Sequence, residues 1–261
     1  MWDPAVYRRF GAERSRPFFD LVRQIGAEQP RAVVDLGCGP GELTRTLAKR
    51  WPGARVTGVD SSPEMIEKAR ADPGPVDFRL GDIAGWRPEP DVDVVVTNAA
   101  LQWVPGHQDM LARWVTELPS GAWLAMQVPG NFDSPGHRAV RELGRTGRYA
   151  GRLADLLRDD PVDDAAGYAA LLTGAGATVD AWETTYLHLL PAVPGEDHPV
   201  LRWMEGTALR PVRAALDEAD WAEFRAELAI RIAETHPEWH GLVAFPFRRI
   251  FVVASIQGTQ S

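Results

Sequence analysis

A short apolar run that leads into three closely spaced glycines is the feature that most limits how this chain folds. Residues 31–36 are mostly apolar, with Asp35 near their end, and Gly37, Gly39 and Gly41 follow at alternate positions. Glycine lets the backbone approach a ligand closely and adopt conformations that other residues avoid. In open α/β folds, ligands bind at the carboxyl ends of the strands. We therefore expect residues 31–36 to form a buried strand that ends in a ligand-binding loop.

Strand and helix signals alternate at short intervals through the first half of the chain. This alternation is the signature of a parallel sheet covered by helices, so the predicted fold class is α/β, a Rossmann-like sheet with helices on both faces. Further strands are expected at 54–59, 76–80, 92–97 and 121–128, and helices at 42–50, after a cap at Ser61 or Ser62, and at 107–118.

The pattern changes after Pro129 and becomes mainly helical. A helix is expected at 163–175, a long strand at 178–190, and a last strand at 249–254. We interpret residues 1–261 as a single domain whose sheet is interrupted by a helical cap insertion. The core takes about 30–128 with strands at about 177–190 and 248–256, and the cap takes about 129–175 and 191–246.

Composition and charge exclude several classes of protein. Apolar residues make up 45% of the 261 residues, and no apolar run reaches the roughly 18 residues that span a bilayer. The N-terminus lacks a basic segment followed by an apolar one, so we expect a cytoplasmic protein. The net charge of −8 without a concentrated basic patch predicts no nucleic-acid partner. We expect no membrane partner and a monomer.

Cysteine and histidine usage predicts neither a disulfide nor a metal site. Cys38 is the single cysteine, so it has no internal disulfide partner, and no Cys/His cluster has zinc spacing. A catalytic thiol is a weak interpretation of Cys38, because this residue lies inside the glycine loop.

The glycine loop differs from the dinucleotide-binding fingerprint G-x-G-x-x-G. The last glycine of that pattern is Glu42 in this chain. The fingerprint directs a helix N-terminus at a pyrophosphate. S-adenosylmethionine (AdoMet) has no phosphate, so a tighter loop after an acidic residue suits it better. We expect Asp35 near the amino-acid moiety of AdoMet, directly or through water.

Three more polar positions follow predicted strands in order. Asp60, with Ser61 beside it, comes about 20 residues past the loop, where a carboxylate can accept both ribose hydroxyls. Asp82 can accept from the adenine amino group, with Ile83 against the ring. Asn98 follows the fourth strand, where backbone groups could hold the methionine end. These positions and the glycine loop occur in order, each at the carboxyl end of a predicted strand.

Together these four features resemble the class I AdoMet-dependent methyltransferases. Six further segments are spread over nearly the whole chain, including the expected cap: 12–17, 98–103, 127–131, 182–186, 206–211 and 244–246. These segments resemble the trans-aconitate methyltransferase family. The resemblance implies AdoMet-dependent esterification of one carboxylate of the tricarboxylate trans-aconitate, giving the monomethyl ester and S-adenosylhomocysteine.

The implied reaction needs positioning more than proton transfer. A carboxylate is ionised at neutral pH, so no general base and no catalytic residue are expected. The protein orients one carboxylate oxygen and excludes water. Arginine suits the carboxylates that do not react, because its planar fork matches them bidentately. The candidate substrate ligands are Arg16, Trp103, Tyr186, His188 and Arg210.

Several of these candidates also have a purely structural interpretation. Arg16 can pair with Glu13 along a helix. His188 can be an ordinary strand residue, and Trp103 can pack in the core. Arg248–Arg249 is expected to flank the last strand at the surface.

Three alternative functions stay open. The first is an AdoMet-dependent methyltransferase of another small carboxylic acid or metabolite. The motifs do not separate this function from methylation of trans-aconitate. The second is an AdoMet- or nucleotide-binding module without catalysis, against which the intact glycine loop and Asp60 argue. The third is a nicotinamide-dependent reductase, which Glu42 disfavours.

Overall fold

The computed structural model describes residues 11–157, 159 and 161–258, and the chain divides into two units. The sheet unit takes Arg14–Pro129, Val162–Thr184 and the chain from Arg249. The helical unit takes Gly130–Pro161 and Thr185–Arg248, with the chain up to Glu13. The single domain expected over 1–261 includes residues 1–10 and 259–261, which lie outside the described residues.

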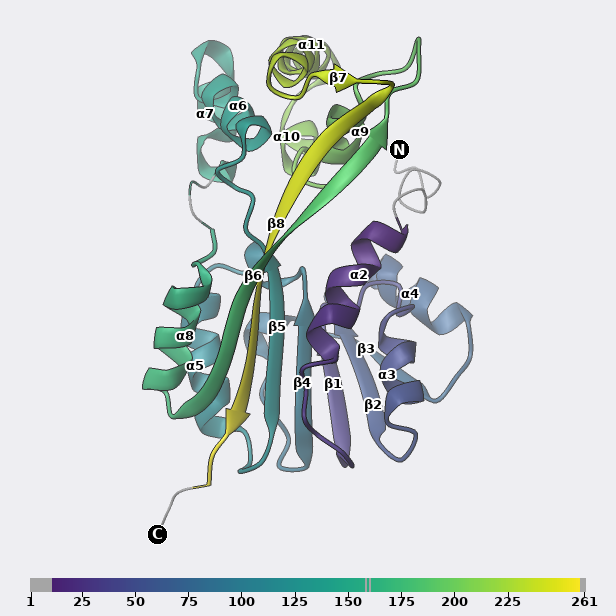
Figure 1. Cartoon of the computed structure of the whole chain (residues 1–261), viewed down its shortest axis with the longest axis vertical. Coiled ribbons are helices and arrows are strands. Elements are labelled where there is room, and N and C mark those ends of the chain that lie inside the picture. The colour runs from purple at the N-terminus through teal and green to yellow at the C-terminus, as the bar shows by residue number, and fades with distance from the viewer. Residues whose placement is uncertain (1–10, 158, 160, 259–261) are drawn as a thin grey trace. The chain divides into compact units, whose positions relative to one another are not determined.

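The sheet has the strand order β3-β2-β1-β4-β5-β8-β6 (Figure 1). Strands β1 to β5 are parallel, and β8 runs antiparallel to β5. The strand order reverses between β1 and β4, which is where open α/β sheets bind ligands. The strands are β1 Ala32–Leu36, β2 Arg55–Asp60, β3 Val76–Leu80, β4 Val92–Asn98, β5 Trp123–Pro129, β6 Ala177–Pro191, β7 Glu238–Trp239 and β8 Leu242–Ile256.

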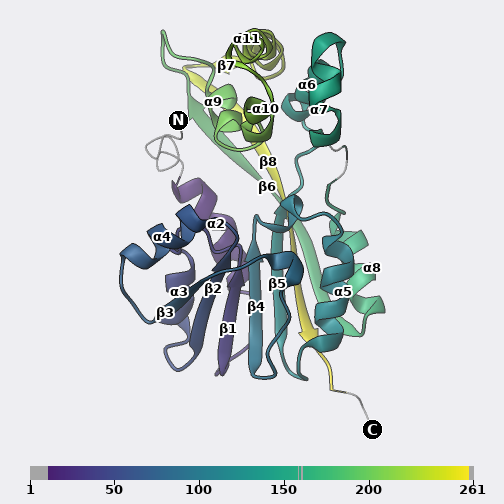
Figure 2. The same cartoon turned by 180° about the vertical axis from the view of Figure 1, so that it is seen from behind.

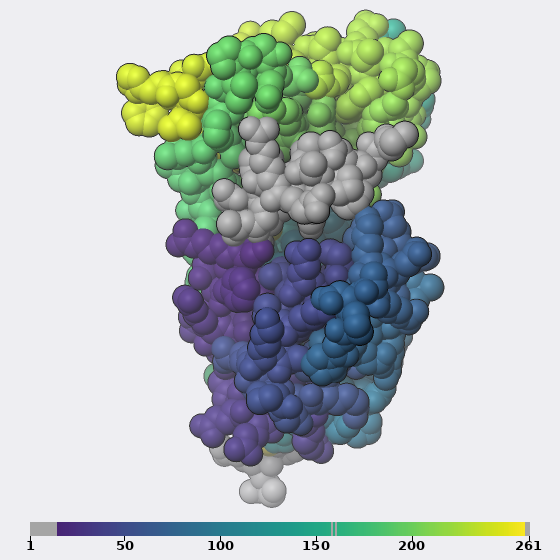
Figure 3. Space-filling model, turned by 90° about the vertical axis from the view of Figure 1, so that its right-hand side faces the viewer, coloured from purple at the N-terminus to yellow at the C-terminus, as the bar shows by residue number. Residues whose placement is uncertain are grey.

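Helices cover both faces of the sheet unit. On one face, Leu36 of β1 shares a buried cluster with Trp114 of α5 and Tyr168 of α8. Figure 2 shows helices α5 and α8 next to each other. On the other, Phe78 of β3 packs with Ile66 of α4. The helices are α2 Gly11–Val22, α3 Thr44–Arg50, α4 Pro63–Ala71, α5 His107–Glu117 and α8 Ala165–Gly174, with short 3-10 turns η1 Ile83–Gly85 and η2 Leu101–Trp103. Figure 3 shows one face of the sheet unit, where the surface is made by N-terminal segments of the chain, coloured purple and blue.

Helix α8 belongs to the sheet unit, although the sequence suggested a cap that extends to about 175. Tyr168 and Leu172 of α8 are fully buried in the same cluster as the sheet. The hydroxyl of Tyr168 lies 2.6 Å from Nε2 of His107 on α5, so a buried hydrogen bond joins the two helices. The first helical segment of the insertion therefore ends at Pro161.

The helical unit has its own apolar core, built around Trp203, Phe224 and Phe245. Strand β8 begins at Leu242, earlier than the expected 248 or 249, because Val243, Phe245 and Phe247 alternate with exposed residues and enter this core. The helices of this unit are α6 Pro135–Gly144, α7 Ala150–Leu153, α9 Pro199–Glu205, α10 Arg210–Ala215 and α11 Glu218–Thr235, with short 3-10 turns η3 Gly147–Tyr149 and η4 Ala154–Leu156. None of the helices described has the length and apolar character needed to cross a bilayer.

Candidate functional site

The glycine loop after β1 meets the segments after β3 and β4. Gly37 has a φ of +82°, and a Cβ there would lie 2.4 Å from the Cβ of Ala100 and 3.5 Å from Cδ1 of Ile83. Neither the conformation nor the space allows a side chain. Gly39 also has a positive φ, +53°, but a Cβ there would meet no atom within 4 Å. The middle of the loop therefore has open space for a ligand.

Asp60, at the end of β2, is held against the same loop. Its Oδ2 accepts from the backbone N–H of Gly39 at 2.9 Å, and its Oδ1 accepts from that of Ser62 at 2.9 Å. Ser62 caps α4 with its hydroxyl, while Ser61 is exposed. The carboxylate predicted to bind ribose and the predicted ligand loop are thus in direct contact.

Asp35 is a buried carboxyl group on β1, only 3% exposed. Its Oδ2 accepts from the hydroxyl of Thr44 at 2.6 Å. Burial raises its pKa to about 6; the Thr44 hydrogen bond opposes this and the charge of Asp60 adds to it. A cationic ligand beside Asp35 would favour the ionised form.

Asp82 and Ile83 follow β3 as expected. Asp82 is exposed, and its Oδ1 accepts from the backbone N–H of Ala84 at 3.0 Å, which caps the turn η1. Ile83 is buried beside Gly37. This pair offers a carboxylate at the surface and an apolar side chain next to the glycine loop.

Asn98 ends β4 next to a strained residue. Ala99 has a φ of +54°, a left-handed conformation that alanine rarely adopts. Gln127 O accepts from Ala99 N at 2.8 Å, and Gln102 Nε2 donates to Ala99 O at 2.6 Å. Within the described residues, Oδ1 of Asn98 is buried without a hydrogen-bond donor. Strain of this kind clusters at ligand sites, and the unsatisfied oxygen adds a side-chain acceptor to the backbone groups predicted there.

Cys38 has none of the properties of a nucleophile. It is buried, and its Sγ lies 3.6 Å from Gly39 O. Burial, then the charges of Asp35 and Asp60, raise the pKa of its thiol. A catalytic cysteine needs a lowered pKa, so the glycine-loop explanation of Cys38 is the better one.

Two of the five predicted substrate ligands belong to the sheet unit. Arg16 is exposed on α2 and forms an ion pair with Asp20 at 3.6 Å. The side chain of Glu13, the partner considered from the sequence, lies outside the described residues. Trp103, on η2, is 56% exposed and so does not pack in the core.

The other three candidates belong to the helical unit. Tyr186 and His188 are buried on β6, and the ring of His188 stacks on Trp203 with centroids 5.0 Å apart. Arg210 is exposed as the first residue of α10. A substrate role for all five residues stays a prediction.

Sequence reasoning missed two buried polar residues in the sheet unit, Gln127 and Arg249. The expectation that Arg248–Arg249 lies at the surface is wrong for Arg249, which is 7% exposed. Its Nη1 donates to Oε1 of Gln127 at 3.4 Å, while the half-buried Arg248 donates to Gly130 O. Arg249 is buried because β8 begins earlier than expected and continues past it. One feature of the sequence could have indicated a buried polar group here: Gln127 is a polar residue inside the apolar run 123–128.

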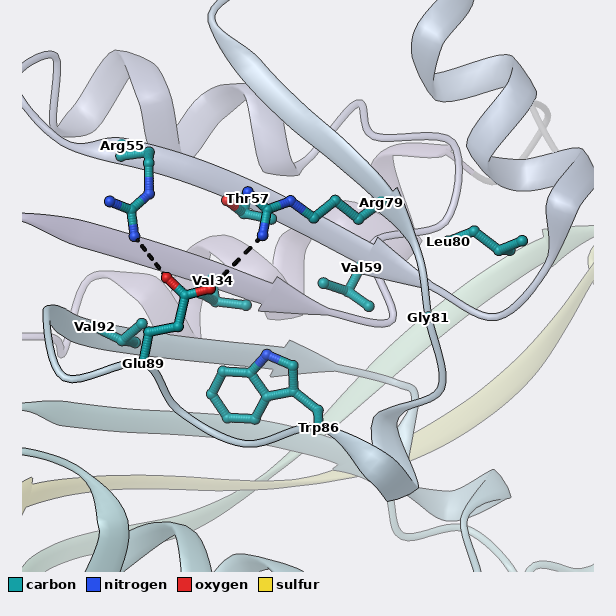
Figure 4. Close-up of a pocket in the computed structure, with 10 residues that line it drawn as sticks. All are labelled: Val34, Arg55, Thr57, Val59, Arg79, Leu80, Gly81, Trp86, Glu89 and Val92. Atoms are coloured by element: carbon teal, nitrogen blue, oxygen red, sulfur yellow. Dashed lines mark hydrogen bonds and ion pairs between the residues drawn. The ribbon is translucent and has the colours of Figure 1, made fainter.

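The sheet unit has a cavity of about 220 Å³. Figure 4 shows the residues that line it. Its apolar wall includes Val59 and Trp86. At its rim, Glu89 pairs with Arg55 at 3.2 Å and with Arg79 at 3.8 Å. None of the residues predicted to bind AdoMet lines this cavity. Across the described residues, no group of three or more His, Cys, Asp or Glu side chains could hold a metal ion.

Curated relatives match over nearly the whole chain. A trans-aconitate 2-methyltransferase of Mycolicibacterium gilvum is 55% identical over 98% of this chain and 100% of the relative. The protein of that name from Rhodococcus jostii is 53% identical over 98% of this chain and 100% of its own length. The one from Mycobacterium tuberculosis is 51% identical over 100% of this chain and 98% of its own length. The family described as a methyltransferase domain matches residues 33–121.

Solved structures share the fold at low sequence identity. The YcgJ protein of Bacillus subtilis is 13% identical with a TM-score of 0.59, over 93% of this chain and 99% of its own. Phosphoethanolamine N-methyltransferase 2 of Haemonchus contortus was solved with S-adenosyl-L-methionine. It is 15% identical with a TM-score of 0.53, over 93% of this chain and 53% of its own. These matches show the Rossmann-like class I methyltransferase fold. The identity to curated relatives goes further, and the chain belongs to the trans-aconitate 2-methyltransferase family.

Proposed function

We propose that this enzyme transfers a methyl group from AdoMet to one carboxylate of trans-aconitate, giving the monomethyl ester and S-adenosylhomocysteine. The observation that carries the substrate assignment is the 51–55% identity, over 98% or more of this chain, to proteins named trans-aconitate 2-methyltransferase. The geometry of the sheet unit supports the cofactor assignment.

The residues at the carboxyl edge of the sheet fit AdoMet. The space over Gly39 admits a ligand against the backbone. The unsatisfied Oδ1 of Asn98 and the buried Asp35 are acceptors for a positively charged amino-acid end. Both oxygens of Asp60 already accept one backbone N–H, and each keeps a lone-pair site for a ribose hydroxyl. We assign contact with the adenine ring to Ile83, and acceptance from its amino group to Asp82.

AdoMet, when bound, supplies an electrophilic methyl group on its sulfonium. The acid substrate arrives ionised, so no side chain needs to remove a proton. The task of the protein is to orient one carboxylate oxygen and to replace the water around it, and positioning alone can supply several kcal/mol, up to about 7–11 in intramolecular models.

Substrate recognition calls for donors that leave the reacting oxygen free. We assign Arg16 and Arg210 to carboxylates that do not react, because a tight ion pair would weaken a nucleophilic oxygen. The indole N–H of Trp103 and the polar atoms of Tyr186 and His188 are neutral donors for the remaining oxygens.

An acceptor panel tests the proposal. Purified protein with AdoMet would be offered trans-aconitate, cis-aconitate or citrate separately, and S-adenosylhomocysteine formation would be followed. We expect the highest kcat/KM with trans-aconitate. Turnover of a different acid with trans-aconitate unchanged would favour the alternative, a methyltransferase of another small carboxylic acid.

A further inference from the structure

Four polar residues, three of them buried and the fourth half-buried, form a row across one face of the sheet unit. Register pairs Asp35 of β1 with Val96, two residues before Asn98 on β4. Asn98 pairs with Gln127 of β5, which pairs with Phe251 of β8, two residues after Arg249. Paired residues, and residues two apart on a strand, share a face. Asp35, Asn98, Gln127 and Arg249 therefore point to the same side of four neighbouring strands.

The two halves of this row have opposite hydrogen-bonding character. Asp35 and the Oδ1 of Asn98 are acceptors. Arginine only donates, so its contact with Oε1 of Gln127 turns the Nε2 donor of that amide away from Arg249. Gln127 is 1% exposed, and within the described residues its Nε2 has no acceptor. Buried donors are almost always satisfied, so this one points to a ligand.

The donor half suits a carboxylate. The Arg249 guanidinium and the Gln127 NH₂, on neighbouring strands, supply hydrogen-bond donors and one positive charge, which is the chemistry that recognises anionic oxygens. Phe251, on the same face, stacks on Trp182 with centroids 4.9 Å apart and adds an apolar wall. The acceptor half, which lies towards the glycine loop, suits the cationic end of the cofactor.

We propose that Arg249 and Gln127 form a carboxylate subsite that binds a non-reacting carboxylate of the acid substrate and sets its specificity for polycarboxylates. This inference rests on the proposed function for the identity of the acid. It places the anionic substrate on β5 and β8, beside the acceptors of β1 and β4, so that opposite charges of cofactor and substrate meet on one face of the sheet.

The test is calorimetric titration of trans-aconitate into protein saturated with S-adenosylhomocysteine. We expect Arg249→Gln to weaken trans-aconitate binding by roughly 10- to 100-fold, the range for loss of a charged hydrogen bond, and Arg249→Lys to restore part of it. Arg248→Gln is the matched control, because Arg248 lies next in the chain and donates to a backbone carbonyl. The affinity of this variant for trans-aconitate should stay within about twofold of wild type.

A second variant keeps the test decisive if Arg249→Gln does not fold. Gln127→Glu preserves size but places a carboxylate beside the guanidinium, so it should abolish trans-aconitate binding while S-adenosylhomocysteine still binds. Equal affinities in wild type, Arg249→Gln and Gln127→Glu would overturn the subsite alone. Binding without turnover in wild type would overturn the proposed function alone, and absence of binding in wild type would overturn both.

Discussion

At the scale of single residues, the buried carboxyl of Asp35 links stability to ligand binding. Burial raises its pKa to about 6 from 3.8, so the folded protein holds this proton to a higher pH than the unfolded chain does. The stability that this group contributes is therefore present below about pH 4 and is lost as the pH rises to about 6. At neutral pH the folded enzyme retains a buried charge that destabilises it.

Replacing Asp35 with Asn should stabilise the ligand-free protein at pH 7 by on the order of 1–3 kcal/mol, because it removes this charge and keeps an acceptor for Thr44. Urea unfolding at pH 4.5 and pH 7 measures the effect, and the gain should be smaller at the lower pH. An equal gain at both values would contradict the raised pKa.

The same Asp35→Asn variant should bind S-adenosylhomocysteine more weakly, by about tenfold. The carboxylate that costs stability in the ligand-free enzyme is the one expected to attract the cationic amino-acid end, a trade of stability against function. Titration calorimetry with Asp77→Asn as the control would decide, since Asp77 is an exposed residue of β3. Undiminished affinity would remove Asp35 from the cofactor site.

Alanine substitutions at two glycines of the loop should affect stability and ligand binding differently. Gly37→Ala places a Cβ against Ala100 and should destabilise the fold by more than the roughly 1–2 kcal/mol cost of a left-handed conformation. Gly39→Ala has room and should cost only about that amount. Because the room at Gly39 is where we place the ligand, Gly39→Ala should nevertheless lose most S-adenosylhomocysteine binding. Unfolding curves and binding titrations of both variants measure this, and normal affinity in Gly39→Ala would argue against the placement.

At the scale of elements, the sequence predicts best the strands that are buried on both faces. β1 and β4 read as mainly apolar runs rich in valine, and the structure has them within a residue or two of the expected bounds. The β8 strand was predicted too short because Pro246 and two arginines interrupt its apolar pattern. The burial of Arg249 depends on pairing with β5, far away in the chain, which local patterns do not reveal.

The contact between α5 and α8 is a second case of tertiary pairing. Nδ1 of His107 lies 3.1 Å from Val104 O, which only accepts, so Nδ1 carries the proton and Nε2 accepts from the hydroxyl of Tyr168. Tyr168→Phe should lower the free energy of unfolding by about 1–2 kcal/mol, since a buried acceptor loses its donor. Chemical denaturation measures the loss, and S-adenosylhomocysteine affinity should not change. A neutral effect on stability would show that this hydrogen bond contributes little.

At the scale of the whole molecule, the sequence predicts the cofactor residues better than the substrate residues. The cofactor residues follow successive strands of one sheet, so strand order alone brings Gly39 and Asp60 together. The substrate candidates come from both units, and no local pattern fixes which donors face the acid. Arg210 was selected by family resemblance, whereas Arg249 emerged only from the sheet register.

Arg210 tests the predicted role of the helical unit. Arg210→Ala should raise the KM for trans-aconitate by about tenfold through loss of a charged donor, while S-adenosylhomocysteine affinity stays unchanged. Steady-state kinetics with Arg213→Ala as control separates substrate binding from a general loss of positive charge on α10. Equal effects of the two substitutions would remove Arg210 as a specific ligand.

The central claim, methyl transfer to trans-aconitate, is tested most directly by mass spectrometry with AdoMet that carries a deuterated methyl group. The enzyme would receive trans-aconitate, cis-aconitate and citrate together in one mixture. We predict that a single labelled methyl group appears on trans-aconitate, as an ester, with little label on the other two acids. Label on another acid alone, or no labelled acid although the protein binds AdoMet, would contradict the substrate assignment.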